Sequence, residues 1–227
     1  MKYTNENGRS MVEMLGVLAI IGVLSVGGIA GYSKAMNKFK INKTTDQVSM
    51  LIANLRTMFS SQGNYEGLTN AQAVSFGVVP DDMYDTCTSG ASGSCAITNP
   101  FGGAVKISSS GLRTKTDEGA FYVAYDNLSQ EACVTLATGD WGSGHSSGLI
   151  AVVAANSMAN AETGANNALI SGIDDTAPAT GGQETQQAAS GYVIAQPGGT
   201  IKTPMPVASA VTGCGSSSGN AVAWKYY

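Results

Sequence analysis

The sequence predicts an α+β protein in which one long N-terminal helix, with a membrane half and an amphipathic half, packs on an antiparallel β-sheet domain held by disulfides. Three observations support this fold class. Residues 14–33 form an uncharged apolar run, the next residues keep a helical apolar spacing as far as Phe59, and the rest of the chain is rich in small polar residues and holds an even set of cysteines. Small polar, glycine-rich segments are typical of turn-rich domains that contain strands.

The composition limits the classes of function. With 227 residues, the chain has room for a membrane-anchored helix and one domain of ordinary size. Charged residues make up 12% of the chain and the formal net charge is -4, whereas nucleic-acid-binding domains carry clustered positive charge. We therefore expect no nucleic acid as a direct ligand.

The first predicted element is a membrane-spanning helix at Met14–Ser33. This uncharged stretch of about 20 residues is long enough to cross the hydrocarbon core of a bilayer. A secretory signal peptide has a shorter apolar region, roughly 7 to 15 residues, followed by a small-residue cleavage site. Ordinary signal-peptide cleavage is therefore the weaker interpretation.

One carboxylate, Glu13, stands at the start of this apolar run. An unpaired carboxylate in a membrane costs several kcal/mol, so Glu13 needs a partner or a polar boundary. In the simplest interpretation it lies at the headgroup level near the helix N-terminus, where the helix dipole favours an anion.

The segment Gly8-Arg9-Ser10-Met11-Val12-Glu13 offers a second explanation. It resembles the prepilin cleavage and methylation signature of type IV pilins. The resemblance implies that a prepilin peptidase cuts after Gly8, that Arg9 becomes the usually methylated N-terminus, and that Glu13 is the fifth mature residue. The freed amine of a neighbouring subunit, offset by about one helical turn, would then pair with Glu13 during assembly.

The same resemblance implies a domain organisation and a location. Residues 1–8 would be the prepilin leader, residues 9–62 the long helix with its transmembrane segment at 14–33, and residues 63–227 the globular pilin head. The precursor would lie in the bacterial inner membrane and the mature subunit in an extracellular pilus. Its partners would be further copies in a helical filament, the prepilin peptidase, and the pilus assembly platform with its ATPase. The implied roles are adhesion, aggregation, motility or conjugation, without enzymatic activity or a cofactor.

Two features depart from the family pattern. The first mature residue is usually apolar, whereas Arg9 is charged and can pair with Glu13 in its own helix at i, i+4 spacing. Only Lys2 and Arg9 precede the apolar run, whereas four lysines follow it, so a positive-inside count favours an orientation with the head inside the cell. The lysines that follow the run are Lys34, Lys38, Lys40 and Lys43. The cleavage motif and the cysteines favour the orientation with the head outside.

Beyond the membrane segment the chain continues as an amphipathic helix. Apolar residues recur at offsets of three and four, at Val48, Leu51, Ile52, Leu55, Met58 and Phe59. The segment Thr44-Thr45-Asp46-Gln47 has capping-box spacing, which allows two helices with a bend near Asn42. We prefer a single helix that ends near Gly63, because no proline intervenes.

Four cysteines, Cys87, Cys95, Cys133 and Cys214, accompany a single histidine, so a zinc site is not expected. Their even number fits two disulfides made in an oxidising compartment, and three connectivities are possible. We favour Cys87–Cys95, which closes a short Gly/Ser loop, and Cys133–Cys214, which ties the C-terminal region to the domain. The longer loop, roughly 80 residues, would stabilise the fold by about 4 kcal/mol. Four unpaired buried thiols are the alternative.

The later segments predict the elements of the head. Strands are expected at 101–108, 120–125, 149–153, 192–195 and 221–227, a short helix at 128–137, and a surface helix with a long exposed loop within 155–190. The order of 79–83 (VPDDM), 99–103 (NPFGG) and 131–133 (EAC) resembles type IVb pilins. Heads of that class lay an antiparallel sheet against the long helix and usually close a large C-terminal region with one disulfide, as Cys133–Cys214 would.

Other functions share some of these features. The segment Gly144-His145-Ser146-Ser147-Gly148 matches the G-x-S-x-G elbow pattern, but its histidine is the only one in the chain and adjoins the serine, so catalysis is not expected. A minor or tip pilin with an adhesive role and a type II secretion pseudopilin share the N-terminal signature. A pseudopilin can bind calcium, for which Asp81-Asp82 and Asp174-Asp175 are candidate ligands. A membrane-anchored domain that does not assemble is the last alternative, and it leaves Glu13 unexplained.

Overall fold

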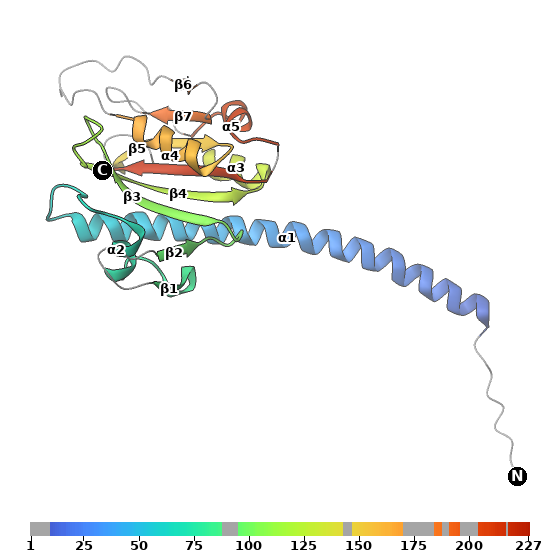
Figure 1. Cartoon of the computed structure of the whole chain (residues 1–227). Helices are drawn as coiled ribbons and strands as arrows, with labels where there is room; N and C mark the ends of the chain where they lie inside the picture. The colour runs from blue at the N-terminus through green and yellow to red at the C-terminus, as the bar shows by residue number, and fades with distance from the viewer. Residues whose placement is uncertain are drawn as a thin grey trace, which may run out of the picture. The chain divides into compact units, whose positions relative to one another are not determined.

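The fold comes from a computed structural model of the chain, which describes residues 10–87, 95–142, 147–169, 184–187, 191–195, 204–216 and 218–227, with the backbone alone for Thr86, 184–187 and 191–195. The chain forms two compact units, Met1–Lys40 and Ile41–Tyr227. The first unit contains the N-terminal part of helix α1. The second contains the rest of α1 with a β-sheet and shorter helices (Figure 1).

Helix α1 spans Met11–Phe59, 49 residues without a break. The preferred single helix is confirmed, and Thr44–Gln47 lie in its interior rather than at a bend. The helix ends earlier than the predicted end near Gly63, because the residues after Phe59 form a turn in which Gly63 has a φ of 71°. A left-handed φ suits glycine and does not continue a right-handed helix.

The second unit contains one antiparallel sheet, in which the described residues form eight strands in the order β1-β2-β3-β4-β8-β5-β7-β6. The last strand of the chain, β8, lies inside the sheet between β4 and β5. All seven residues of β8 are buried. The strands are β1 (Tyr84–Cys87), β2 (Cys95–Thr98), β3 (Ala104–Ser110), β4 (Ala120–Leu128), β5 (Leu149–Ala155), β6 (Glu184–Gln187), β7 (Gly191–Ala195) and β8 (Asn220–Tyr226).

The predicted strands at 101–108, 120–125, 149–153, 192–195 and 221–227 correspond to β3, β4, β5, β7 and β8. Strand β3 begins only at Ala104, because the Asn99 side-chain oxygen accepts the backbone N–H groups of Phe101 and Gly103 and holds them in a turn. The sequence did not indicate β1, β2 or β6, which are short strands at or near the two edges of the sheet. Such strands depend on their neighbours more than on an apolar alternation of their own.

Four shorter helices occur within the described residues: α2 (Asn70–Ser75), α3 (Gln130–Ala137), α4 (Met158–Asn167) and α5 (Val207–Gly213), with a 3-10 turn η1 at Asp81–Met83. Thr69, Ser129 and Ser157 cap α2, α3 and α4 with side-chain oxygens that accept backbone N–H groups of the first turn. Helix α3 confirms the helix predicted at 128–137, and α4 confirms the one predicted within 155–190. Residues 170–183 of the predicted loop lie outside the described residues.

The two faces of the sheet are packed differently. Alternate residues of β4 point to opposite faces, with Phe121, Val123 and Tyr125 on one and Ala120, Tyr122 and Ala124 on the other. The first face packs large side chains against α1, α2, α3 and α5. The second face is dominated by alanine and is covered by α4.

Both disulfides of the favoured pairing are present. Cys87–Cys95 joins β1 to β2, and Cys133–Cys214 joins α3 to the residue that ends α5. The alternative of four unpaired thiols is therefore wrong.

Candidate functional site

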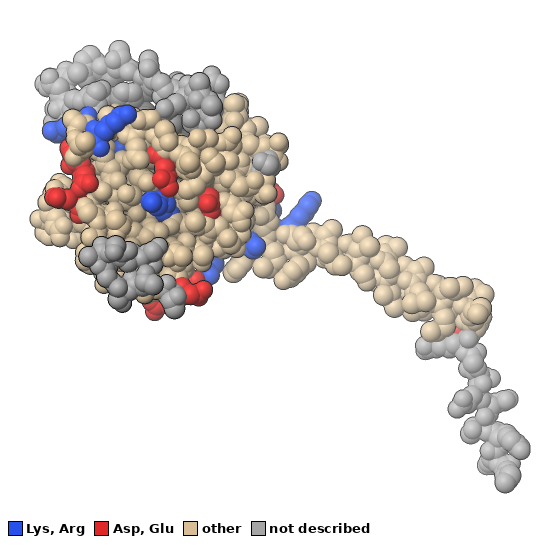
Figure 2. Space-filling model, viewed as in Figure 1, with Lys and Arg blue, Asp and Glu red and all other residues tan. Residues whose placement is uncertain are grey.

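In the first unit, α1 exposes apolar side chains all around. From Met11 to Ile29, every valine, leucine, isoleucine and methionine side chain is at least 44% exposed, and almost no charged atoms mark this stretch in Figure 2. By its length and composition α1 can cross a membrane. The hydroxyls of Ser25 and Ser33 donate to backbone carbonyls one turn earlier, at 2.7 and 3.0 Å, so these polar groups are already satisfied within the helix.

Glu13 lies exposed in the first turn of α1. The backbone N–H groups of Glu13 and Met14 donate to the Ser10 carbonyl at 2.9 and 3.2 Å, which places Ser10 at the start of the helix. Glu13 is the only charged residue of α1 before Lys34, and the helix dipole favours an anion at this end. Gly8 and Arg9 lie outside the described residues, so the cleavage bond and an Arg9–Glu13 pair stay predictions.

In the second unit, α1 buries an apolar face that includes Val48, Leu51, Leu55 and Phe59. Polar contacts on its flanks tie the helix to the head. Lys43 Nζ lies 2.7 Å from Asp82 Oδ2, Asn54 Nδ2 donates to the Val78 carbonyl at 3.2 Å, and Arg56 Nη1 donates to the Ser147 carbonyl at 2.8 Å. This half of α1 is therefore a structural part of the head.

The acidic pair predicted as a calcium candidate has other partners. Asp82 pairs with Lys43, and Asp81 Oδ1 accepts the Tyr84 hydroxyl at 3.0 Å. Asp174 and Asp175 lie outside the described residues. Within the part of the chain that the structure describes, no three His, Cys, Asp or Glu side chains gather in a way that could hold a metal ion.

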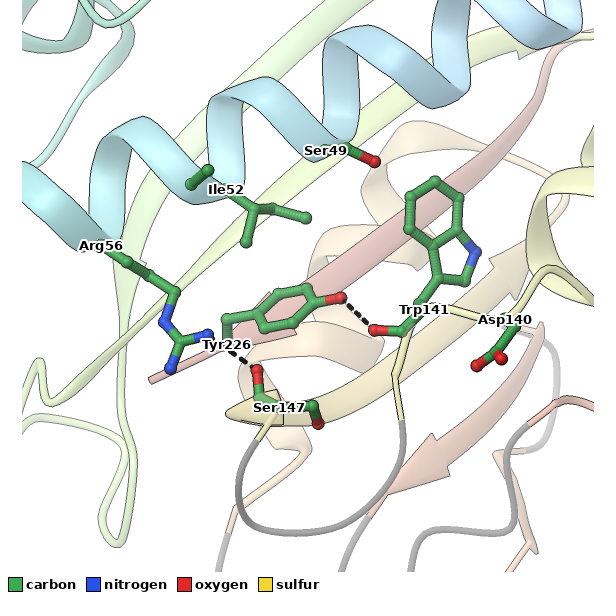
Figure 3. Close-up of a pocket in the computed structure, with 8 residues that line it drawn as sticks. Ser49, Ile52, Arg56, Asp140, Trp141, Ser147 and Tyr226 are labelled. Atoms are coloured by element: carbon green, nitrogen blue, oxygen red, sulfur yellow. Dashed lines mark hydrogen bonds between the residues drawn. The ribbon is translucent and has the colours of Figure 1, made fainter.

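A pocket of about 280 Å³ opens in the second unit beside α1 (Figure 3). It lies between α1, the segment after α3, the start of β5 and the end of β8, and its lining residues are Ser49, Ile52, Ala53, Arg56, Asp140, Trp141, Ser147 and Tyr226. Hydrogen bonds fix its walls: the Tyr226 hydroxyl donates to the Trp141 carbonyl at 2.8 Å, and Arg56 donates to the Ser147 carbonyl. Burial raises the pKa of Tyr226, with Arg56 opposing, so the hydroxyl keeps the proton that it donates.

Gly148, the last residue of the G-x-S-x-G segment, occupies a backbone position that favours glycine for structural reasons. Gly148 has a φ of 68°, and a Cβ built there would lie 2.7 Å from Arg56 Nη2. The left-handed φ favours glycine here, and a Cβ would also lie 2.9 Å from the backbone carbonyl oxygen of Tyr227. The other Nη atom of Arg56 is hydrogen-bonded to the Ser147 carbonyl. Gly144, His145 and Ser146 lie outside the described residues.

Lys225 is a buried charge that the sequence analysis did not single out. It lies on β8 with no exposed surface, and its Nζ donates to the carbonyls of Ala165 and Ala168 at 2.9 and 2.7 Å, at the C-terminal end of α4. Burial lowers the pKa of Lys225 to about 8, with Asp117 opposing. A sequence signal for the burial of Lys225 was available, because alternate residues of a strand point to the same face and Lys225 therefore shares a face with Ala221 and Ala223.

Comparison with known proteins gives a consistent result. The family model described as PilS N terminal matches residues 38–189. The chain is 27% identical over 133 residues to the major structural subunit of bundle-forming pilus from Escherichia coli O127:H6, covering 59% of this chain and 64% of the relative. It is 28% identical over 145 residues to toxin coregulated pilin from Vibrio cholerae serotype O1, covering 60% and 59%. These matches span less than two thirds of either relative.

The fold is also similar to that of a solved pilin. The crystal structure of TcpA, a type IV pilin from Vibrio cholerae El Tor biotype, aligns with a TM-score of 0.50 and 21% identity, covering 83% of this chain and 99% of that one. The family model covers more than half of the chain, and the long helix, antiparallel sheet and disulfides fit it. The chain therefore belongs to the type IV pilins, in the type IVb family described as PilS N terminal.

Proposed function

We propose that this chain is a structural subunit of a type IV pilus. Met14–Ser33 anchors the precursor in the inner membrane, prepilin peptidase cuts between Gly8 and Arg9, and the mature chain assembles with further copies through α1. The observation that carries the proposal is the apolar half of α1, whose large side chains from Met11 to Ile29 are all exposed in the single chain. Lipid covers this surface before assembly, and neighbouring helices cover it in the filament.

Glu13 gives the assembly its axial register. A carboxylate surrounded by apolar helices is stabilised when a neighbour's N-terminal amine lies beside it, and a subunit at another offset leaves the charge unpaired at a cost of several kcal/mol. The names of two relatives, a major structural subunit of a pilus and a pilin, support the role of a pilus subunit and say nothing of Glu13.

The first test is the N-terminal mass of protein recovered from sheared surface material. We expect a chain that starts at Arg9, with or without one added methyl group, as the main component of the filaments. A start at Met1 or beyond Ala30 would contradict prepilin processing. A minor pilin or pseudopilin would have the same N-terminus but would be a trace component of that material.

The second test is a Glu13→Ala variant. We expect it to be cut normally and to remain in the membrane without forming filaments, because the register contact is lost. Processing is followed by the mass of the membrane-bound chain and assembly by the sheared fraction. A Glu66→Ala variant, which removes an exposed carboxylate of the head, is the control and should assemble. Normal filaments from Glu13→Ala would rule out the role of Glu13.

A further inference from the structure

A basic segment follows the apolar run of α1 directly. The chain has no acidic residue between Glu13 and Asp46, and the charged residues there are Lys34, Lys38, Lys40 and Lys43. Lys43 is paired within the head. Lys34 and Lys38 belong to the first unit, are exposed, and have no ion-pair partner among the described residues. In Figure 2, blue side chains begin on α1 where its uncharged stretch ends.

We propose that Lys34 and Lys38 bind the headgroups of anionic phospholipids, in the leaflet on the side of the membrane where the head lies. This contact rests on the membrane anchor of the proposed function and deepens it, because it names the lipid that the anchored subunit contacts and the depth at which α1 stops in the bilayer. The ligand is the headgroup of a lipid with a net negative charge, such as phosphatidylglycerol, rather than that of a zwitterionic lipid.

The spacing of charges along α1 matches the thickness of a bilayer. Glu13 and Lys34 are 21 positions apart in one unbroken helix, which corresponds to about 31 Å along its axis. The hydrocarbon core of a bilayer is about 30 Å thick. When Glu13 lies at one boundary of this core, Lys34 therefore lies at the other. Lys38 then lies one turn further out, by about 6 Å, within the headgroup layer.

The side chains at this level face more than one side of the helix. Lys34 and Lys38 are one turn apart and share a side, whereas Tyr32 and Phe39 are seven positions apart and share another, at least about 100° away. The two aromatic side chains are 65% and 60% exposed. Tyrosine suits the membrane boundary, because its ring is apolar and its hydroxyl is polar. A partner protein would cover one side, whereas a headgroup layer surrounds the helix, so lipid fits this arrangement better.

The chemistry of lysine suits a lipid headgroup. Its ammonium group is a compact charge on a flexible stem, so it can contact a phosphate from many directions without a fixed geometry. The stem can lie along apolar surface while the charge reaches the headgroup. Because residues 14–45 contain no acidic side chain, nothing in the same stretch of helix neutralises the two lysines. A lysine beside an anionic membrane surface strengthens binding about fivefold.

The direct test places the photoreactive residue p-benzoylphenylalanine at Ala35, an exposed position between the two lysines, in the full-length chain. The chain is reconstituted in vesicles of phosphatidylcholine with phosphatidylglycerol as the minor lipid, both with the same acyl chains. After irradiation, the lipid attached to position 35 is identified by mass. We expect phosphatidylglycerol to be enriched at least about threefold over its share of the vesicle.

Two double variants assign this enrichment to the lysines. Lys34→Gln/Lys38→Gln should reduce it to the share of phosphatidylglycerol in the vesicle, because the attraction to the anionic headgroup is lost. Lys106→Gln/Lys115→Gln removes two exposed lysines of the head and changes the net charge equally, so it should keep the enrichment. High salt should weaken the enrichment in the natural chain, because salt screens exposed charges.

A second probe position separates failure of the lysine contact from failure of the anchor. Leu24 lies within the apolar run and is 69% exposed, so a probe there should attach to lipid of either kind. Lipid adducts at position 24 without enrichment of phosphatidylglycerol at position 35 would overturn the lysine contact alone. Equal enrichment in the natural chain and in Lys34→Gln/Lys38→Gln would overturn it as well. The absence of lipid adducts at both positions would also contradict the membrane anchor of the proposed function.

Discussion

Among single residues, Lys225 shows how a charge is accommodated inside this fold. Its ammonium group lies in the alanine-rich layer between the sheet and α4, bonded to the carbonyls of Ala165 and Ala168. The C-terminal end of a helix carries partial negative charge, so α4 supplies both hydrogen-bond acceptors and a favourable field. Alanine side chains bury little apolar area, so their packing alone stabilises the contact between α4 and the sheet only weakly. The two hydrogen bonds from Lys225 add to this contact and help to hold α4 in place.

The lowered pKa of Lys225 predicts a rise in stability with pH. The folded chain releases this proton near pH 8, whereas the unfolded chain holds it up to the ordinary pKa of 10.5. Between these values the unfolded state binds more protons, so the free energy of unfolding increases with pH. Above about pH 10 buried tyrosines reverse the trend, because they ionise more readily when unfolded.

The measurement is denaturant unfolding between about pH 8 and 9.5. We expect Lys225→Met to lose the rise, because methionine does not titrate. Lys106→Met, which removes an exposed lysine of β3, should keep it. Equal slopes in Lys225→Met and the natural chain would show that Lys225 is not the group responsible.

Gly148 gives a second prediction at the residue scale. Gly148→Ala places a Cβ against Arg56 in a left-handed backbone conformation, so we expect a loss of about 1–3 kcal/mol in the free energy of unfolding. Gly77 has the same φ of 68° but open space around it, so Gly77→Ala should cost only the backbone term, about 1 kcal/mol. Thermal unfolding of both variants checks the difference. Equal losses would mean that Arg56 and the Tyr227 carbonyl both move away without cost.

Among the elements, α1 is one continuous helix whose two halves have different surfaces. Its first half is apolar on every side, as suits lipid or a bundle of other helices. Its second half buries one face and carries polar ties such as Lys43–Asp82 on its flanks. The same element therefore has the length and composition of a membrane span in its first half and forms part of the core of the head in its second.

The two disulfides should contribute unequally to the stability of the head. Cys133–Cys214 closes a separation of 81 residues and Cys87–Cys95 one of 8. In the chain-entropy description, these loops correspond to about 4 and about 2 kcal/mol. We expect the double variant Cys133→Ser/Cys214→Ser to lose about 2 kcal/mol more than Cys87→Ser/Cys95→Ser, measured by denaturant unfolding. A larger loss from the short loop would contradict this description.

At the scale of the whole molecule, the head forms its core without the membrane segment. Every buried residue that the structure describes lies at Ile41 or later, and the compact unit of the head begins at the same residue. The described core of the head therefore lies entirely in the second unit, and the first unit contributes no buried residue to it.

This division predicts that a chain lacking residues 1–33 folds as a soluble head. Because no described core residue is removed, its melting temperature should lie within a few degrees of that of the detergent-solubilised full chain. It should not sediment with membranes or enter filaments. Circular dichroism on heating and fractionation of cells measure these properties. A large loss of stability would mean that the apolar half of α1 supports the head.

Much of this architecture was predictable from local sequence. The uncharged run at 14–33 and the apolar spacing at Val48–Phe59 have the period of a helix, so α1 follows from the sequence alone. Strands β3, β4, β5, β7 and β8 were found because apolar residues recur in them. The cysteine spacing favoured the pairing that the structure has. Local pattern also identified Gly8, Arg9 and Glu13 as the processing and assembly segment, which stays a prediction.

What the sequence could not decide depends on contacts between distant segments. The insertion of β8 between β4 and β5 is set by which apolar faces pack together, and no local signal encodes it. The same holds for Lys225, whose polar partners lie about 60 residues earlier in the chain, and for the pocket, whose walls come from four separate segments. The sequence by itself therefore determined helix α1, the strands β3, β4, β5, β7 and β8, and the favoured disulfide pairing. Only the tertiary structure decided the strand order, the buried charge and the pocket beside α1, because burial and hydrogen bonding depend on the whole fold.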